Sequence, residues 1–592
     1  MPTIKGYRFL LKYIALLELL FIISRMALVW RYNIEVEPLF FIYSLRMDIM
    51  ILSALLLVPI ILYSLNLLLL TRLFLSFVVF VVAYLELSNY LFFEEFGTRL
   101  NYLFIAYLEY PKEVFDMIWR SYKVALLVGV PILLLMALLF FRTLKPKLSS
   151  ISHKLILFPM ILPFLFLGLR SSVDSSTPNQ SFYSYSSSTL KNDMANNTIF
   201  SLAYASYLKA KDKIPDYGKV EGELQTELTH LQKSSFSKKR DVVLVLMESF
   251  GHTYVGAMGG TPTTPRFDSM SKDGLFCSNM YSSSNRSNRG FEAVLGSLYP
   301  LSSDTYLKLA KSQNNFWTVA RAMREQGYRT VFLYGGDSKF DNMRGFAINN
   351  GFDEVIDKFD FDLSIKRYTW GVSDEELYKR AESILEESKE PLFLMMFTLS
   401  SHKPFDYPDS KIEYYDKAPV ESFANSVKYA DFALGGFYDY LKKREFFEDG
   451  LLTVVADHNA HIFGEPKIPV REFRIPALFI GKDIEPKEIK EITHQIDIAP
   501  TMLDMAGVET TSPTMGRDLT QDEEFNALII HHRAFAYLKN GSFVLYQKDT
   551  KPAIYDFDYN QIEDNSTLIQ EGLNYIYSSY KIYKQQLHKG NF

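Results

Sequence analysis

Two carboxylates and a histidine stand where short apolar runs of the sequence end. Glu248 follows the run DVVLVLM at 241–247, and the pair Asp457 and His458 follows LLTVVA at 451–456. Apolar runs of this length are typical of buried strands, and an Asp-His pair is costly to bury without a partner. Oxygen and imidazole ligands without a thiolate suit Mn²⁺, Mg²⁺ or Zn²⁺. The pattern therefore predicts one divalent-metal site at two strand ends, with surface turns as the alternative.

A loop rich in hydroxyl groups, SSSNRSNRG at 282–290, lies between these two runs. Its Ser287 is flanked by Arg286 and Arg289, and the helical pattern GFEAVLGSL follows directly. A metal lowers the pKa of a nearby hydroxyl, and arginines and the start of a helix favour phosphoryl oxygens. We interpret Ser287 as a candidate nucleophile of phosphate chemistry and Arg289 as a candidate phosphate contact. A polar surface loop is the alternative.

Two more polar segments follow apolar runs. His402, in TLSSHKPF, can hydrogen-bond a phosphoryl oxygen or protonate a leaving group. Asp337, Lys339 and Arg344, in YGGDSKFDNMR, can bind a polar head group, and the glycines allow a close approach of the backbone. For this second segment, a turn followed by a helix cap is the alternative interpretation.

Two other residues carry less weight. His461, three residues after His458, can reach a second metal only with further carboxylates, and the sequence identifies none. Asp497, in HQIDIAPTML, is interpreted as a helix cap or a brace for the site rather than as a metal ligand.

The elements that must position these residues are the strands of a largely parallel sheet. Short apolar runs alternate with helical patterns such as 315–326 and 373–388, which is typical of an α/β fold. Ligand sites in such sheets collect at the carboxyl ends of the strands, where the candidate residues fall. The runs are 241–247, 329–334, 391–398, 451–456 and 475–480.

Long apolar stretches in residues 1–170 predict a membrane domain. Lysines and arginines in the loops between its spans place the N-terminus in the cytoplasm, and an odd number of spans sends the rest of the chain outside. Without the third span, the weakest, that orientation would invert. The five expected spans, each about 16 to 22 residues long, are 9–30, 46–65, 73–93, 123–141 and 154–169.

Charged and amphipathic features mark the membrane part. Arg46 and Asp48 begin the second predicted span, and charges in a bilayer face protein or water. They are interpreted as an ion pair that holds helices together or snorkels to the interface, or as a site for a lipid head group. The aromatic segment 89–122 predicts a helix along the outer interface.

Length and composition bound the remaining possibilities. The chain has 592 residues, too many for one core, and a net charge of -5 without a basic stripe, which argues against nucleic acid. Its single cysteine, Cys277, excludes an internal disulfide and cysteine-based zinc sites. We expect four parts: a membrane domain at 1–170, a serine-rich linker with helices that pack on the outer domain at 171–240, a catalytic domain at 241–510, and a small α+β subdomain without catalytic residues at 511–592.

Taken together, these motifs resemble the lipoteichoic acid synthase-like phosphoglycerol transferases of the alkaline phosphatase/sulfatase superfamily. The resemblance covers nearly the whole chain. It implies a five-span membrane domain in a bacterial cytoplasmic (inner) membrane, a linker, and a sulfatase-like α/β domain outside the cytoplasm. The motifs are LMESFG (246–251), NRSNRG (285–290), YGGD with FDNM (334–343), SSHKPF (400–405), ADHN (456–459) and QIDIAPTML (495–503).

The resemblance also implies roles for individual residues. His402 matches a substrate-site histidine, and Asp337 and Arg344 match contacts to the head group. One metal, usually manganese, is held at the positions of Glu248, Ser287, Asp457 and His458. Two departures stand out: the family usually has threonine where this chain has Ser287, and a tryptophan after the GD motif is missing, with Asp341-Asn342 nearby instead.

The implied reaction moves a phosphoglycerol-type head group from a phosphatidylglycerol-like lipid to a hydroxyl of a glycan or polymer, through a covalent phospho-Ser287 intermediate. A phosphoethanolamine transferase is a first alternative, which the single cysteine disfavours because such enzymes usually carry several disulfides. A sulfatase-like ester hydrolase is a second. True sulfatases mature their nucleophile from a Cys or Ser that has proline two residues later, whereas Ser287 is followed by Asn288 and Arg289. A non-catalytic membrane sensor is a third, and the intact metal set disfavours it.

Overall fold

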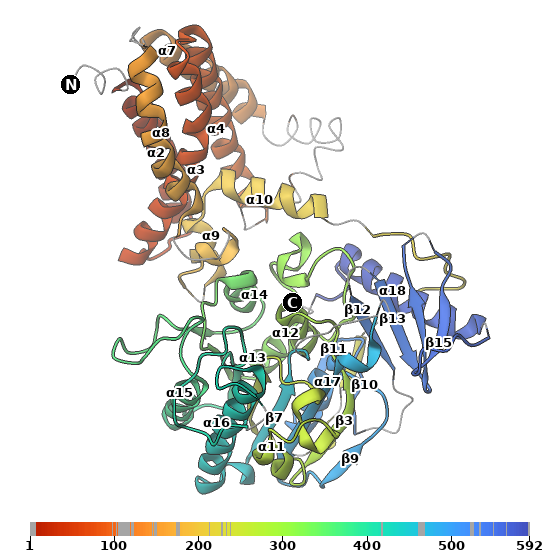
Figure 1. Ribbon diagram of the computed structural model, residues 1–592. Coiled ribbons are helices and arrows are strands. Elements are labelled where there is room, and N and C mark those ends of the chain that lie inside the picture. Colours follow the sequence, from red (N-terminus) through yellow and green to blue (C-terminus); the bar gives the residue numbers. More distant parts are fainter. Residues whose placement is uncertain are drawn as a thin grey trace. The chain divides into compact units, whose positions relative to one another are not determined.

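The computed structural model divides the chain into two compact units, Met1–Ala210 and Lys211–Phe592, shown in Figure 1. The residues described run from 8 to 589 and leave out 97–98, 102–103, 105–118, 120–122, 145, 147–150, 173–177, 187, 212–213, 227–228, 233, 237, 416–417, 460–467, 521–525, 532–533, 549 and 564. His461 and most of the predicted interface segment therefore lie outside the described residues.

The first unit is helical. Three of the five predicted spans correspond to helices that are long and apolar enough to cross a membrane, at Phe9–Arg31, Pro38–Ser64 and Leu68–Glu94. Over the described residues, the other two correspond to shorter apolar helices, so the count of five stays a prediction. The helices are α2 (Arg8–Arg31), α3 (Pro38–Ser64), α4 (Leu68–Phe96), α7 (Val130–Thr143) and α8 (Ile151–Arg170).

The charges of the second predicted span do not pair with each other. Asp48 is fully buried and forms two hydrogen bonds of 2.8 Å with Arg25 of α2. Arg46 instead binds Ser171 at 2.9 Å and lies over the ring of Phe182. The interpretation of Asp48 as part of a helix-holding ion pair is therefore confirmed, with Arg25 as its partner.

The segment after the last apolar helix belongs mostly to the first unit, and its packing on the outer domain stays a prediction. Two helices expected to pack on the outer domain, α9 (Thr189–Ala195) and α10 (Thr198–Lys211), lie almost wholly in the first unit, which ends at Ala210. Buried Arg99 explains this placement, since its guanidinium donates hydrogen bonds to the backbone carbonyls of Asp193 and Met194. Carbonyls that end a helix need such donors.

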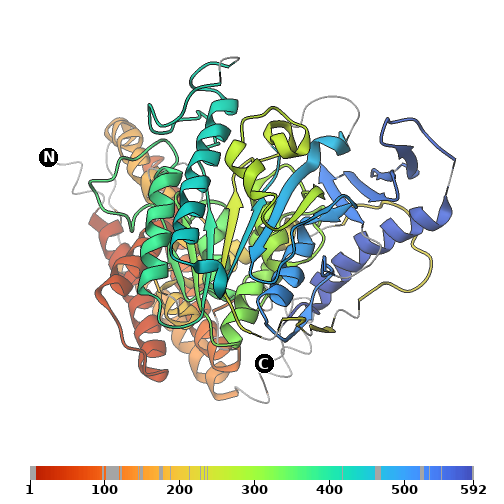
Figure 2. The same ribbon diagram turned by 90° about the horizontal axis from the view of Figure 1, so that it is seen from below.

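The second unit is built on a nine-stranded sheet with the order β10-β3-β8-β7-β2-β6-β4-β5, with β9 beside β3. Its central strands β7, β2, β6 and β4 are parallel to one another, and helices cover both faces (Figure 2). The five apolar runs predicted from the sequence are strands of this sheet. The strands are β2 (Asp241–Met247), β3 (Leu275–Tyr281), β4 (Arg329–Tyr334), β5 (Glu354–Ile356), β6 (Leu392–Phe397), β7 (Gly450–Ala456), β8 (Arg474–Gly481), β9 (Lys487–Ile489) and β10 (Thr493–His494).

Helices complete the layers on either side of the sheet. The helix α15 packs on α16, and α16 also packs on α11, while α12 contacts both α13 and α17. Strands β6 and β7 are buried along their whole length, as expected for parallel strands covered on both faces. The helices are α11 (Pro265–Met270), α12 (Ser287–Gly296), α13 (Val319–Glu325), α14 (Met343–Asn349), α15 (Asp374–Glu387), α16 (Phe423–Lys443) and α17 (Ile498–Met505).

The C-terminal part forms a separate four-stranded antiparallel sheet with a long helix, α18 (Ser566–Gln585). The predicted hairpin turns at Asn540 and Gly541, both with positive φ, 49° and 77°. Two positive φ values in a row are what a two-residue turn between twisted strands needs. The strands are β12 (Ala527–His531), β13 (Ala534–Lys539), β14 (Ser542–Tyr546) and β15 (Ala553–Asp556).

Candidate active site

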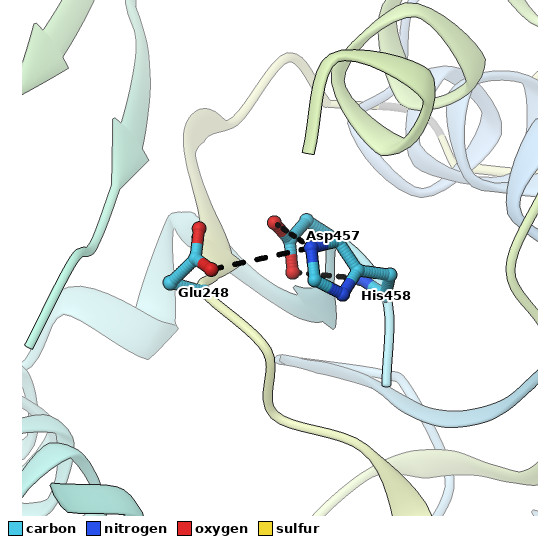
Figure 3. A group of neighbouring side chains, drawn as sticks. All are labelled: Glu248, Asp457 and His458. Carbon is cyan, nitrogen blue, oxygen red and sulfur yellow. Dashed lines mark hydrogen bonds and ion pairs between the residues drawn. The ribbon is translucent and has the colours of Figure 1, made fainter. Parts of the chain in front are cut away.

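Strand register brings the predicted metal ligands together. Strands β2 and β7 are parallel neighbours in which Met247 pairs with Ala456, so the next residues, Glu248 and Asp457, leave the sheet side by side. One ligand atom each from Glu248, Asp457 and His458 lies within 4.8 Å of the others; Glu248 and Asp457 are buried, and the His458 side chain is 12% exposed. Figure 3 shows their side chains pointing toward one another. The cluster proposed from the sequence is therefore present.

Ser287 joins this cluster from a third element. It is the first residue of α12, and its Oγ lies 3.2 Å from Glu248 Oε2 and 3.2 Å from His458 Nε2. Close packing of α12 against the end of β7 makes this possible. A Cβ at Gly290 would lie 2.3 Å from the carbonyl oxygen of Asp457, so only glycine permits the approach.

The donor set fits a divalent cation. Asp457 Oδ1 accepts the backbone N–H groups of Ser249 and His458, but its buried Oδ2 accepts no hydrogen bond from the described residues. Burial, together with the nearby charge of Glu248, raises the pKa of Asp457 well above its usual range. Two carboxylates this close in a buried site need a positive charge between them.

His458, the histidine of this donor set, is also oriented to bind a cation. His458 Nδ1 lies 2.9 Å from the carbonyl oxygen of Asn459, a distance at which the ring N–H donates to that oxygen. The other ring nitrogen, Nε2, then presents a lone pair toward Asp457 Oδ2, 3.4 Å away. A backbone carbonyl that fixes the tautomer in this way is the usual outer partner of a metal-bound histidine. Zn²⁺, Mn²⁺ and Mg²⁺ all remain compatible with these ligands.

A cavity of about 310 Å³ opens beside the cluster. Glu248, Ser287 and His458 line it, together with positively charged Arg286 and Lys403. His402, which follows β6, lines it as well. The cavity therefore combines a hydroxyl, a candidate metal site and cationic side chains, which is a combination suited to a phosphate ester.

A buried carboxylate fixes the backbone just before His402. Buried Asp374, at the start of α15, accepts the backbone N–H groups of Leu399 and Ser400 through its Oδ1. His402 Nδ1 lies 3.1 Å from the carbonyl oxygen of Lys403, which leaves Nε2 available to the cavity. His402 thus lines the cavity, and its contact with a substrate oxygen through Nε2 stays a prediction.

Trp370 is a lining residue that sequence reasoning missed. It comes from the segment between β5 and α15, and its ring centroid lies 3.9 Å from that of His402. Its indole Nε1 donates to the carbonyl oxygen of Lys403 at 2.6 Å. Trp370 also lines a small pocket whose other lining residues include Glu248 and Ser287. The signal in the sequence is weak, because Trp370 stands 32 residues before His402 and follows no apolar run.

Asp341 is the acidic residue of the YGGDSKFDNMR segment that lines the cavity. It has a positive φ of 50° and accepts a hydrogen bond of 2.7 Å from Asn288, the neighbour of Ser287. Lys308 forms an ion pair with it. Asp337, which the sequence favoured for this role, accepts the backbone N–H of Lys339 within its own turn, and its contact with a head group stays a prediction.

Neither predicted arginine contact is among the cavity-lining residues described. Arg289 binds Glu292 and the carbonyl oxygens of Leu301 and Asp304. It lies two residues beyond Ser287 on α12, which is more than half a turn around the helix and therefore away from the cavity. Arg344 donates to the carbonyl oxygen of Val355. Arg286 lines the cavity in their place.

Asp497 has the structural role expected of it. Its Oδ2 accepts the backbone N–H of His494 at 2.8 Å in a capping box, and its Oδ1 accepts that of Arg517 at 3.0 Å. The nearby Gln495 braces the site directly, because its amide donates to the carbonyl oxygens of Ala456 and Asp457. The motif HQIDIAPTML therefore supports the metal cluster by fixing the backbone around Asp457.

Known proteins share this fold and this sequence pattern. The Sulfatase family matches residues 240–508. A solved structure from Vibrio parahaemolyticus, described as a protein in the alkaline phosphatase superfamily, is 35% identical with a TM-score of 0.60, and the match covers 66% of this chain and 97% of that one. The lipoteichoic acid synthase LtaP from Listeria monocytogenes, 21% identical with a TM-score of 0.53 over 65% of this chain and 98% of its own, shares the fold.

A curated relative is also similar in sequence. The lipoteichoic acid synthase-like protein YvgJ of Bacillus subtilis is 25% identical over 348 residues, which cover 54% of this chain and 55% of YvgJ. The chain thus spans about half the length of the curated relatives it matches. With the Sulfatase match, the 35% identical structure shows that the chain belongs to the alkaline phosphatase/sulfatase superfamily, and its sequence is similar to that of lipoteichoic acid synthase-like proteins.

Proposed function

We propose that this protein is a metal-dependent transferase that moves a phosphoglycerol-type head group from a membrane phospholipid to a hydroxyl of a glycan or polymer. The observation that carries the proposal is the position of Ser287 Oγ, 3.2 Å from both Glu248 and His458 at the start of a helix. A hydroxyl placed among metal-type ligands, beside a cationic cavity, is suited to attack a phosphate ester. The similarity to proteins named lipoteichoic acid synthases supports the choice of head group.

A divalent cation, with Mn²⁺ as our first candidate and Mg²⁺ or Zn²⁺ as others, would be held by Glu248, Asp457, His458 and the hydroxyl of Ser287. When bound, it would lower the pKa of that hydroxyl and offset the charge of the phosphoryl group. Glu248 and His458 hold the hydroxyl in place through their contacts of 3.2 Å. The positive end of the α12 dipole and Arg286 add to the attraction for the phosphate oxygens.

The first half of the reaction transfers the group to the protein. Ser287 Oγ, which has already released its proton to solvent, forms a bond to the donor phosphorus, and the bond from phosphorus to the oxygen of diacylglycerol breaks. The leaving oxygen takes a proton from His402 Nε2, which the contact between Nδ1 and the Lys403 carbonyl directs toward the cavity. A phosphoglycerol ester of Ser287 and a neutral His402 result.

The second half releases the group. The acceptor hydroxyl gives its proton to His402 and attacks the same phosphorus, and the bond to Ser287 Oγ breaks. The product is the phosphoglycerol diester of the acceptor, and both side chains return to their starting states. We place this chemistry outside the cytoplasm of a bacterium, with the N-terminal helices anchored in the membrane that contains the lipid donor. The three helices long enough to span it support that placement.

The test is single-turnover reaction of the full-length protein with phosphatidylglycerol labelled in its head group. Ser287→Ala should lower diacylglycerol release by at least about a thousandfold, because the nucleophile is lost. Mass spectrometry of the wild-type peptide that contains Ser287 should show the added mass of phosphoglycerol. Ser284→Ala is the matched control, because Ser284 lies in the same loop and is not among the described cavity-lining residues. Undiminished turnover by Ser287→Ala would refute the proposal.

A further inference from the structure

Ser249 contacts two of the three metal-type ligands at once. Its hydroxyl donates to Glu248 Oε1 at 2.7 Å, and its backbone N–H donates to Asp457 Oδ1, also at 2.7 Å. The residue is buried, with 6% of its surface exposed. One side chain and one peptide group therefore bind carboxylates that come from two different strands.

The backbone at Ser249 is in an unusual conformation. Its φ is +56°, in the left-handed region that serine rarely adopts and that glycine adopts freely. This conformation turns the chain sharply after β2, so that the N–H group faces Asp457 while the hydroxyl folds back onto the preceding Glu248. Strain of this kind persists where the surrounding structure requires it, and it gathers at functional sites.

The two hydrogen bonds divide the oxygens of each carboxylate. With Oε1 of Glu248 bound by Ser249, Oε2 is the oxygen that contacts Ser287 Oγ at 3.2 Å. With Oδ1 of Asp457 bound by the N–H groups of Ser249 and His458, Oδ2 is left without a hydrogen bond from the described residues. Each carboxylate thus has one oxygen that Ser249 does not bind, while Glu248 Oε1, which Ser249 does bind, also lies 4.0 Å from His458 Nε2.

We propose that Ser249 is a positioning residue that selects which oxygen of Glu248 and which oxygen of Asp457 face the cation, and thereby sets the affinity of the site for Mn²⁺. This inference rests on the metal site of the proposed function. Ser249 lines the cavity beside Glu248, and its hydroxyl is engaged by the hydrogen bond to Glu248 Oε1. It acts by stopping both carboxylates from rotating, so that less conformational freedom is lost when a cation binds.

Two substitutions separate the hydroxyl from the turn. Ser249→Ala removes the hydroxyl and keeps the strained backbone, whereas Ser249→Gly removes the hydroxyl and relieves the strain. If Ser249 serves only the turn, Ser249→Gly should bind Mn²⁺ as tightly as the wild type. If the hydroxyl positions Glu248, both variants should lose affinity by about tenfold or more, as for other partners of metal ligands.

The experiment is Mn²⁺ titration of the full-length protein in detergent, followed by the electron paramagnetic resonance signal of free Mn²⁺. Thermal unfolding in EDTA accompanies it. We expect weaker Mn²⁺ binding in both variants, with the unfolding temperature of metal-free Ser249→Gly at or above that of the wild type. Ser284→Ala should retain the wild-type affinity.

The outcomes distinguish this inference from the proposed function. Wild-type affinity in both variants, with a wild type that binds Mn²⁺, would overturn the role of Ser249 and leave the proposed function standing. A wild type that binds no Mn²⁺ would overturn both. Weakened binding together with raised KM for Mn²⁺ and a kcat restored at saturating Mn²⁺ would support positioning rather than chemistry.

Discussion

At the scale of single residues, buried carboxylates decide much of this site, and each is defined by how its two oxygens are bound. Asp457 and Asp374 each have one oxygen that accepts two backbone N–H groups and one that accepts no hydrogen bond from the described residues. Asp457 lies in the metal cluster, where a cation can satisfy its second oxygen. Asp374 lies outside that cluster and supports the His402 loop, so its unpaired oxygen carries a free-energy cost.

That cost predicts a pH-dependent effect of Asp374→Asn. Burial raises the pKa of Asp374 from 3.8 to about 6. Because the folded protein holds this proton more tightly than the unfolded chain, the side chain destabilises the fold progressively as pH rises from about 4 to about 6, by up to about 3 kcal/mol. Asparagine keeps the acceptor for Leu399 and Ser400 and carries no charge. Relative to the wild type, Asp374→Asn should therefore gain unfolding temperature at pH 7.5 and gain little at pH 4.5.

The measurement is thermal unfolding of both proteins in EDTA at the two pH values, so that metal binding does not contribute. An asparagine variant that is less stable than the wild type by the same amount at both values would show that the carboxyl group is satisfied in its ionised form.

At the scale of elements, the site depends on how closely α12 approaches the end of β7. Register places Glu248 and Asp457 side by side, but Ser287 reaches them only because Gly290, one turn along the same helix, lies against the backbone of Asp457. A helix that stood further from the sheet would carry Ser287 out of contact with the carboxylates. The glycine of the NRSNRG motif is thus as necessary to the geometry as the serine.

Gly290→Ala tests this packing. The added Cβ would lie 2.3 Å from the carbonyl oxygen of Asp457, so either α12 or the Asp457 backbone must move. We expect a loss of stability of about 1 to 3 kcal/mol and a fall in kcat of at least about tenfold, because Ser287 shifts relative to the ligands.

Gly436→Ala is the matched control for this substitution. Gly436 is exposed in α16, and a Cβ there would meet nothing within 4 Å. Alanine is the better helix former, so this variant should be as stable as the wild type or more so, with unchanged activity. Equal behaviour of the two variants in unfolding and turnover assays would disprove the packing argument.

At the scale of the whole molecule, two units have separate cores. The second unit, which contains the candidate active site, packs apolar residues around its sheet. The first unit, which contains the predicted membrane spans, has a buried polar cluster centred on Arg25 and Asp48. Asn197, from the start of α10, also donates to Asp48 at 2.8 Å. The cluster therefore joins the residues just before α10 to the helices α2 and α3.

A double substitution tests whether this ion pair holds the membrane unit together. Arg25→Met leaves Asp48 buried with the hydrogen bond from Asn197 but without its charged partner, which should destabilise the full-length protein by about 3 to 5 kcal/mol. Arg25→Met combined with Asp48→Leu removes both charges and should recover most of that loss. Thermal unfolding in detergent measures the effect, and a double variant at least as unstable as the sum of the single variants would contradict the pairing.

Much of the catalytic fold follows from the sequence alone. Buried parallel strands are apolar along their whole length, so the runs before Glu248, His402 and Asp457 are readable without a structure. Because parallel strands end at the same edge, residues that follow such runs meet there, and the metal-type ligands could be named in advance. Asp497 could be assigned as a cap for a similar reason, since capping depends on near neighbours in the chain.

Only the tertiary structure decided the rest of the site. Trp370 meets His402 and Asp341 meets Lys308 across loops whose paths no local pattern fixes. Arg289 turns away from the cavity because the helix that carries it packs through Gly290, and Asp48 pairs with Arg25 across two helices. Periodicity reports which face of an element is buried. It does not report the partner that buries it, because that contact joins residues distant in sequence, and register and packing select it.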